Sequence, residues 1–203
     1  MVHIFPSPEA EVAATLSTIS AADLPPLVYA HGADHDLALT ATPTAFRSVV
    51  GAGWVKPTAG GLWTAPVTNS TPDGLPADSA WLEWCRSEMP TGDYTRLTEI
   101  VPDASARVLV VDTQSDLIRI VDAYPASYGL HLSSIDDRYP DWPALAANGW
   151  DALYLTDNGQ WETRLPPRGP NLYGWDVATV FWLRPAYTVG RTAVVPASQG
   201  GAA

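Results

Sequence analysis

The chain has 203 residues, of which 46% are hydrophobic and 16% charged, a composition that suits one globular domain with an ample core. The net charge of −11 at pH 7 disfavours nucleic acid and anionic membranes as partners, so a nucleic-acid acceptor would require a local basic patch. The one cysteine, Cys85, excludes an internal disulfide and a cysteine-built metal site. A reducing, cytoplasmic setting without a membrane segment is therefore expected, because there is also no long apolar run and no basic, apolar leader.

The chain is expected to form a single domain between two appendages. Residues 1–26 are expected to be an N-terminal helical appendage, helical from Ser7 to about Ser20 and ended by Leu24-Pro25-Pro26. Residues 27–195 form the domain, and residues 196–203 are expected to be a disordered tail. The 19 prolines and 15 glycines predict long, ordered connections between short elements, and such connections usually carry function.

Short apolar segments bounded by turn residues predict the strands of this domain. The run Val108–Val111 is typical of a strand covered on both faces, and the last segment is expected at a sheet edge. Pro66 is expected to end the strand in which it lies. The predicted strands are Leu27–Gly32, Leu62–Val67, Tyr94–Val101, Arg107–Asp112, Trp150–Leu155, Val177–Leu183 and Thr188–Val195.

Capping residues and helical periodicity predict short helices between these strands. Thr42-Pro43 is expected to begin a helix that presents Ala45, Phe46, Val49 and Val50 on its apolar face. Further helices are predicted over Ala80–Glu88, capped by Asp78 or Ser79, over Ser115–Tyr124, and from Asp141 to Asn148 with Gly149 as a left-handed stop. The segment Asp157–Tyr173 lacks periodicity, and its length makes it a candidate functional loop.

The stretch Lys56–Thr64 joins backbone freedom to a rigid aromatic side chain. Gly60 and Gly61 permit positive φ and the close approach of a ligand to the backbone, and the strand that follows would hold Trp63 as a stacking surface. The alternative is a Gly-Gly turn before an ordinary strand with a core tryptophan. Trp81 and Trp84 fall at helical spacing, which is typical of core, and are further candidates for the wall of a ligand cleft.

The common catalytic motifs are absent from the sequence. It contains no phosphate-cradling P-loop, no Gly-x-Gly-x-x-Gly turn, no Gly-x-Ser-x-Gly elbow and no His-Glu-x-x-His pair. His31 and His35 are four residues apart, but no third ligand is near. A metal site is therefore not expected.

Four short motifs nevertheless occur in a characteristic order along the chain. A strand ends in His31-Gly32, a second begins Gly61-Leu62-Trp63, a helix and strand follow over Leu145–Leu153, and Asp176 precedes an apolar strand. In this order the chain resembles the ADP-ribosyltransferase superfamily, which includes bacterial toxins and their phage-encoded or defence-system relatives. There the motifs are His-Gly, Gly-Leu-Tyr, Leu-x-x-x-Gly-Tyr-Asp-Gly-Ile and an acid before a Val-Val-Phe strand. The resemblance covers roughly residues 27–190.

The resemblance implies an α+β fold with a split, mixed β-core of two small sheets flanked by short helices, and NAD bound as substrate in the cleft between them. Asp176 would supply negative charge to the sugar as the nicotinamide–ribose bond breaks. His31 would hydrogen-bond the adenine-side ribose, and the Gly32 backbone would grip the nicotinamide carboxamide. His31, Trp63 and Asp176 are therefore expected to converge on one cleft.

The remaining contacts to NAD are also implied by the resemblance. Trp63 would stack on the nicotinamide ring, Thr64 would add a hydroxyl contact, and Gly61 would let the ligand approach the backbone. Lys56 would reach a phosphate as a point charge. The segment Asp157–Tyr173, with two arginines among few acids, would recognise a macromolecular acceptor, whether protein or nucleic acid.

Two departures from the family pattern bear on this assignment. Trp63 stands where the family usually has tyrosine, which keeps stacking but loses a hydroxyl. Asp176 stands where the family usually has glutamate and is one methylene shorter, which bears directly on catalysis. Each residue also has a structural interpretation, since a strand-end histidine, a capping aspartate and a core tryptophan are common.

Two other functions remain open. The first is a non-catalytic, inhibitory domain that binds a ligand or protein in the same Trp-rich cleft. The second is a carbohydrate-binding module, since exposed tryptophans stack on sugars. That option requires that the nine tryptophans of the chain are not mostly buried.

Overall fold

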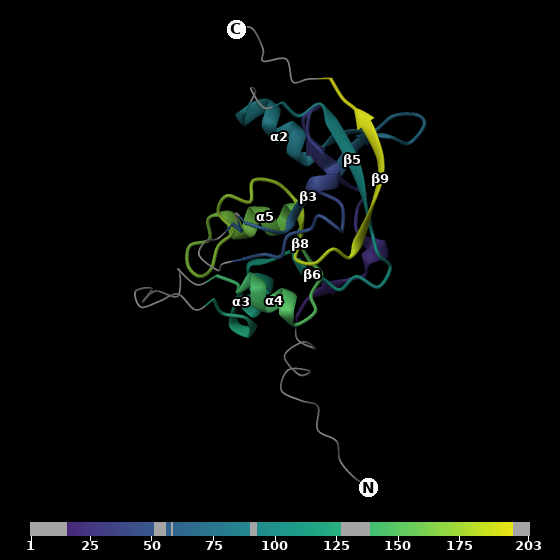
Figure 1. The fold of residues 1–203 in the computed structure, drawn as a ribbon. Coiled ribbons are helices and arrows are strands. Elements are labelled where there is room, and N and C mark those ends of the chain that lie inside the picture. Colours follow the sequence, from purple (N-terminus) through teal and green to yellow (C-terminus); the bar gives the residue numbers. More distant parts are fainter. Residues whose placement is uncertain (1–15, 51–55, 58, 90–92, 127–138, 197–203) are drawn as a thin grey trace.

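The structure, a computed structural model, describes residues 16–50, 56–57, 59–89, 93–126 and 139–196. Within these residues it is mixed α+β, with nine strands in one mixed sheet and four α-helices beside it (Figure 1). The α+β class and the short helices are thus confirmed. No helix in the described part of the chain is long and apolar enough to cross a membrane. The predicted tail beyond residue 196 and the start of the predicted N-terminal helix lie outside the described residues.

The strand order is β1-β6-β7-β8-β3-β2-β5-β9, with β4 paired to β3. All pairs are antiparallel except β6 and β7, which run parallel and whose connection contains α3 and α4. The edge position predicted for the last strand is confirmed. The strands are β1 Thr18–Ile19, β2 Leu27–His31, β3 Leu62–Ser70, β4 Pro76–Ser79, β5 Arg96–Pro102, β6 Val108–Val111, β7 Ala152–Leu155, β8 Thr179–Trp182 and β9 Tyr187–Val194.

The α-helices are α2 Ala80–Glu88, α3 Gln114–Ala123, α4 Trp142–Ala147 and α5 Asp157–Arg164. The first three confirm the predicted helices. Ser79 caps α2 by accepting a hydrogen bond from Leu82 N, and Thr113 with Asp116 forms a capping box at α3. Gly149 takes the predicted left-handed conformation after α4, with φ of 81°.

The helix predicted to begin at Thr42-Pro43 is wrong. The Thr42 hydroxyl bonds back to the carbonyl of Ala38 instead of capping a new helix. The following segment gives its backbone groups to a distant partner, since Arg47 O accepts from Gly61 N at 2.8 Å and Val50 N donates to Ala59 O at 3.3 Å. These long-range bonds replace the local bonds that a helix would need.

The predicted N-terminal helix does not extend to Ser20. Thr18–Ile19 forms β1, paired with Leu109 and Val108 of β6, and a short 3-10 helix covers Ala21–Asp23.

Pro66 does not end β3, because it lies opposite the first residue of β2 and the next amide, Val67 N, bonds to Pro26 O at 2.8 Å. The strand continues to Ser70.

The interpretation of Asp157–Tyr173 as a loop is wrong for its first half, which is α5. Thr156 caps this helix by accepting from Gly159 N at 2.9 Å. A side chain at Gly159 would place its Cβ 2.0 Å from Val111 O, so the glycine lets α5 pack directly on the end of β6. Residues 165–173 form the irregular connection toward β8.

The sheet divides at β3, and this division positions the candidate site. Residues Leu62–Thr64 of β3 pair with β8, whereas β2 pairs with β3 only at Ala65 and Pro66. Beyond Val28, β2 diverges from β3 but stays paired with β5 as far as His31. A gap therefore opens between two strands that remain anchored in the same sheet.

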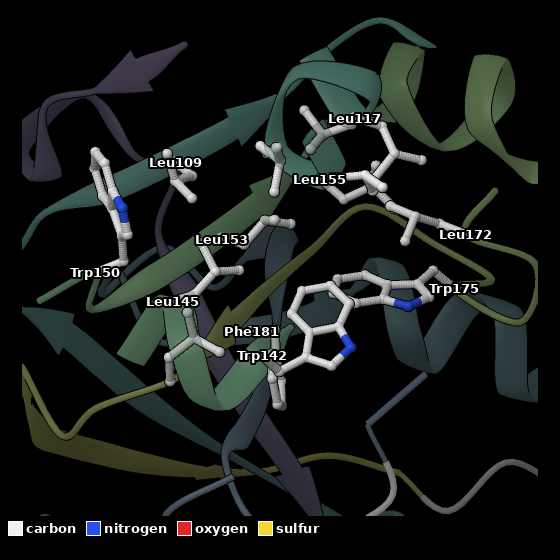
Figure 2. Close-up of a cluster of buried hydrophobic side chains, with 14 of the residues drawn as sticks. Leu109, Leu117, Trp142, Leu145, Trp150, Leu153, Leu155, Leu172, Trp175 and Phe181 are labelled. Carbon is white, nitrogen blue, oxygen red and sulfur yellow. The ribbon is translucent and has the colours of Figure 1, made fainter. Parts of the chain in front are cut away.

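The largest core cluster lies on the β6–β7–β8 side of this division. Figure 2 shows leucines of β6, β7 and α3 packed with tryptophans from α4 and from the segment before β8. Trp142 and Trp175 are each 1% exposed and stack with ring centroids 5.6 Å apart. Helix α2 lies instead at the opposite end of the molecule (Figure 1), where it packs against β3 and β4. Leu82 of α2 packs there with Val28 and Leu97.

Candidate active site

A cavity of about 290 Å³ lies where β2 and β3 diverge. Its walls come from β2, from β3, from the first turn of α2, and from the segment just before β8. The lining residues are Val28, Tyr29, Ala30, Lys56, Trp63, Thr64, Ala65, Trp81, Tyr94, Trp175, Asp176, Val177 and Thr179. Four predicted site residues, Lys56, Trp63, Thr64 and Asp176, are thus brought together.

Lys56 lies close to both Trp63 and Asp176 within this cavity. The Lys56 ammonium lies 5.1 Å from the centroid of the Trp63 ring and 3.9 Å from Oδ2 of Asp176. It also donates a hydrogen bond of 2.9 Å to the carbonyl of Gly174. Burial lowers the pKa of Lys56, and the Asp176 carboxylate partly opposes this shift.

The fold places Asp176 at the cavity through its neighbours in the chain. Gly174 turns the backbone with φ of 89°, and Trp175 anchors the segment in the core. Arg164 of α5 approaches the other carboxylate oxygen of Asp176 at 3.5 Å. The acid is therefore 17% exposed and shared between two cations, Lys56 and Arg164.

Trp63 is held in place by packing against other aromatic rings. Its ring lies 4.6 Å from the Trp175 ring and 4.4 Å from the Phe181 ring, centroid to centroid. Phe181 is also its partner in the β3–β8 pairing. The aromatic ring is thus fixed in orientation at the cavity wall, as a stacking surface must be.

The hydroxyl of Thr64 is engaged within the protein. It donates to Val180 O at 2.8 Å and accepts from Trp182 Nε1 at 3.2 Å, and the residue is 3% exposed. Its contribution to the cavity wall therefore comes from the rest of the residue. The hydroxyl itself stabilises the β3–β8 pair.

His31 is not among the residues that line the cavity. It is 4% exposed, and both ring nitrogens have partners: Gly32 O at 2.9 Å and Thr98 Oγ1 at 2.9 Å. Thr98 continues this chain of hydrogen bonds to Thr192 of β9 at 2.7 Å. Burial lowers the pKa of His31, which fits a neutral ring tied to β5 and β9.

The predicted glycines border the protein interior. A Cβ at Gly32 would lie 2.9 Å from Asp93 O, and one at Gly61 would lie 2.3 Å from the Phe181 ring. A Cβ at Gly60 would similarly lie 2.1 Å from Ser48 O. The positive φ predicted for the pair is confirmed at 77° and 71°, and the space opposite both residues is filled by packed protein atoms.

A second cavity, of about 330 Å³, adjoins the first. Tyr29 and Trp63 line both, so the two share a wall. The other residues of the second cavity are Thr40, Ala45, Arg47, Gly60, Gly61 and Leu62. Gly61 and Arg47 thus line the adjoining cavity, whereas Asp176 lines the first.

Sequence reasoning missed Tyr29 and the role of Arg164. Tyr29 lies two residues before His31 on the same face of β2, and its ring stacks on that of His31 at 5.7 Å. Side chains two residues apart on a strand lie on the same face, so the position of Tyr29 relative to His31 is the sequence signal that could have identified it. Trp81, predicted as a wall candidate, does line the cavity, and its ring stacks on that of Trp84 at 5.0 Å.

Of the eight tryptophans in the described residues, four are buried and three are partly buried. Trp142, Trp150, Trp175 and Trp182 are each at most 3% exposed, and only Trp161 of α5 is strongly exposed, at 82%. This distribution does not offer the row of exposed rings that a carbohydrate-binding module needs. Among the described residues, no group of three His, Cys, Asp or Glu side chains is placed to hold a metal ion.

Comparison of the chain with protein-family models, with curated proteins and with solved structures finds no significant match.

Proposed function

We propose that the protein is an NAD-dependent ADP-ribosyltransferase that acts on a macromolecular acceptor, in the manner of a toxin or of an effector in conflict between bacteria and phage. The observation that carries the proposal is the meeting of Asp176 and Trp63 in one cavity, across the β3–β8 pair. Motif order alone led us to expect these two residues together. The cavity supplies the two elements that the reaction needs, an aromatic surface and a carboxylate.

The chemistry assigns one task to each residue. Cleavage of the nicotinamide–ribose bond leaves positive charge on the sugar, and a nearby carboxylate stabilises that charge most in the transition state. Asp176 takes this role. Trp63 holds the nicotinamide ring by stacking, which is favoured while the ring carries its positive charge.

The dimensions of the two cavities suggest how a dinucleotide is accommodated. Sites for ligands of drug size usually measure about 300 to 1,000 Å³, so the first cavity alone fits only the nicotinamide half. We assign the adenosine half to the adjoining cavity, of about 330 Å³, which shares Tyr29 and Trp63 with the first. Arg47 lines that second cavity and would pair with a phosphate.

In this proposal His31 positions the end of β2 rather than touching NAD. Its ring is committed to Thr98 and Gly32, and contact with a ribose would require it to break one of these bonds. The adjacent residues Tyr29 and Ala30 line the cavity directly. The histidine therefore fixes the wall that the substrate meets.

A second candidate is a non-catalytic domain that holds a ligand or a protein in the same cavity. The observation that favours it is the state of Asp176, whose carboxylate already has Arg164 and Lys56 as partners. Two cations reduce the negative charge that the sugar would experience. A binding domain needs no free carboxylate.

The deciding experiment is NAD consumption by the purified protein, with released nicotinamide as the readout. We expect Asp176→Asn still to bind NAD in calorimetry and to lose roughly 10²- to 10³-fold in kcat with little change in KM. Asp176→Glu, which restores the longer side chain of the family, should retain or raise the rate. Asp103→Asn, at an exposed aspartate after β5, is the matched control and should have no effect.

Two results would reject the enzyme. A wild-type protein that binds NAD and never releases nicotinamide, with protein and nucleic-acid acceptors from a host extract present, is a binding domain. Equal rates for wild type and Asp176→Asn would mean that another group carries the reaction.

A further inference from the structure

The ammonium group of Lys56 occupies a site built from several cation-binding groups. The indole rings of Trp63 and Trp81 lie with their centroids 5.1 and 5.8 Å from Nζ, and both distances fall within the range of cation–π attraction. Gly174 O accepts a hydrogen bond from Nζ at 2.9 Å, and the Asp176 carboxylate lies at 3.9 Å. These four groups come from β3, α2 and the segment before β8.

The character of these groups selects organic cations over metal ions. Aromatic faces attract a large, weakly hydrated positive charge, and they are the usual surface for quaternary ammonium groups. Hard metal ions instead need several oxygen ligands. Only one carboxylate, Asp176, is present among the four groups, and the described residues contain no metal-binding cluster.

Lys56 holds this position although it is only partly enclosed. Its side chain is 38% exposed, so the ammonium can leave the rings for water without unfolding the surrounding strands. It is also the only lysine of the chain, whose other strong bases are all arginines. A compact ammonium fits between two indoles, whereas a planar guanidinium would require more room.

We propose that this cavity is an aromatic cage for a small organic cation, a quaternary ammonium or an N-alkylated pyridinium, and that the Lys56 ammonium is its resident, displaceable occupant. The cage stands on the geometry of Lys56, Trp63, Trp81 and Asp176 and does not require that NAD is turned over. It goes beyond the proposed function because it makes Lys56 a built-in competitor for the site.

The competition has a quantitative consequence. A ligand that needs an empty cage binds with an apparent Kd raised by the inverse of the fraction of molecules in which the cage is empty. A tethered ammonium also competes at an effective concentration in about the millimolar range. Removal of the Lys56 charge should therefore strengthen the binding of an external cation by about tenfold or more.

The test is a calorimetric titration of wild type and Lys56→Met with tetramethylammonium chloride. Methionine keeps an unbranched apolar stem but carries no charge. We expect Lys56→Met to bind tetramethylammonium about tenfold tighter than wild type, and neither protein to bind tert-butanol, the neutral analogue of similar shape. Equal affinity of the two proteins for tetramethylammonium, or no binding by either, would overturn the proposal.

A second pair of variants locates the binding. In the Lys56→Met background, Trp81→Leu should weaken tetramethylammonium binding by about fivefold, the loss expected for one cation–π contact. Trp161→Leu in the same background changes an exposed tryptophan of α5 that does not line the cavity, and it should have no effect. If both variants bind like their parent, the cation binds elsewhere and the proposal fails.

Wild-type protein supplies a measurement that does not depend on any variant. With lysine isotope-labelled at Cε, the chain gives a single lysine signal, and the two indole rings should shift that signal away from the free-lysine position. Saturating tetramethylammonium should return the signal toward the free position. A signal that starts at the free position or does not move contradicts a displaceable occupant, whether or not the protein consumes NAD.

Discussion

The guanidinium of Arg164, in the last turn of α5, lies 3.5 Å from the carboxylate of Asp176, which precedes β8. The contact joins the helix that follows β7 to the wall of the cavity. The Arg164 side chain is 41% exposed, so solvent screens the pair, and such pairs contribute about 1 kcal/mol at most to stability. Its main effect is on the charge that Asp176 presents to a ligand.

The two arginines of the 157–173 segment should therefore behave differently. Arg164→Gln removes one of the two cations beside Asp176, and we expect NAD hydrolysis in water to rise severalfold because more of the carboxylate charge then acts on the sugar. Arg168→Gln, at an exposed position, should leave hydrolysis unchanged and weaken only the modification of a macromolecular acceptor. Nicotinamide release and acceptor labelling, measured in parallel, separate the two effects. Identical profiles for both variants would contradict this division.

The packing around Gly61 predicts a loss of stability when a side chain is added. A Cβ there would lie 2.3 Å from the Phe181 ring and 2.9 Å from Trp182 O, and φ is 71°. Overpacking of this kind costs about 1 to 3 kcal/mol. Gly74→Ala is the matched control, because φ is similar at 77° but no atom lies within 4 Å of the added Cβ. We expect Gly61→Ala to lower the free energy of unfolding measured in urea by at least about 1 kcal/mol more than Gly74→Ala does.

The outcome at Gly61 also distinguishes two interpretations of the Gly-Gly pair. A pair that serves the close approach of a ligand should tolerate alanine in the free protein and lose ligand affinity. A pair that serves packing should lose stability without ligand. Similar stabilities of Gly61→Ala and Gly74→Ala would favour the ligand interpretation.

Strands and capped helices could be predicted because their signals are local. The run Val108–Val111 is apolar throughout and became a strand buried in the sheet, and Ser79 stands directly before the helix that it caps. Such signals require no knowledge of distant partners. They account for most of the elements of this fold.

The failed predictions concern segments whose structure depends on distant partners. Residues 46–50 have a helical apolar pattern, but their backbone bonds to Ala59 and Gly61, which the pattern does not reveal. Helix α5 was missed because Asn158 and Gly159 are poor helix formers. Gly159 is tolerated because the helix packs there on Val111, and the Asn158 side chain donates a hydrogen bond to Asp112 O. Tertiary contacts overrode local propensity in both segments.

The candidate site was predictable only in part for the same reason. Trp63 and Asp176 could be paired by motif order, and they line one cavity. The partners of His31 could not be foreseen, because Thr98 lies on another strand and only the β2–β5 register brings it to the ring. The ion pair of Arg164 likewise depends on a helix that the sequence pattern conceals.

The buried ring of His31 predicts a loss of stability in mild acid. Burial lowers the pKa of His31 in the folded protein, so the unfolded chain binds the proton more readily. The contribution of the neutral His31 ring to folding stability is therefore complete above about pH 6.5, the pKa of an unperturbed histidine. It is lost as the pH falls through the lower pKa of His31 in the folded protein. Urea unfolding of wild type from about pH 7 to pH 5 should show this decline, and His31→Gln should show a shallower one. Parallel curves for the two proteins would exclude His31 as its source.

The carboxylate of Asp116, at the start of α3, predicts a second loss of folding stability, at lower pH. Burial alone would raise its pKa, but hydrogen bonds from Ser17 and Thr113 and the nearby Arg119 outweigh burial and lower the pKa to about 2. The folded protein therefore holds the carboxylate charged at pH values where the unfolded chain is already protonated. The stabilisation is present above about pH 4 and is lost as the pH falls toward 2.

The size of this effect follows from the shift. A pKa that falls from 3.8 to about 2 corresponds to about 2 kcal/mol of stability at neutral pH. Both carboxylate oxygens of Asp116 accept hydrogen bonds, one from the Ser17 hydroxyl and the other from Thr113 N, and Asp116→Asn keeps only one acceptor oxygen, so it should cost at least about 2 kcal/mol at neutral pH. The gap between wild type and Asp116→Asn, measured by urea unfolding, should narrow as the pH falls from about 4 to about 2. Asp103→Asn should show no such gap at any pH, and a gap for Asp116→Asn that stays constant across this range would mean that the carboxylate charge is not what stabilises the start of α3.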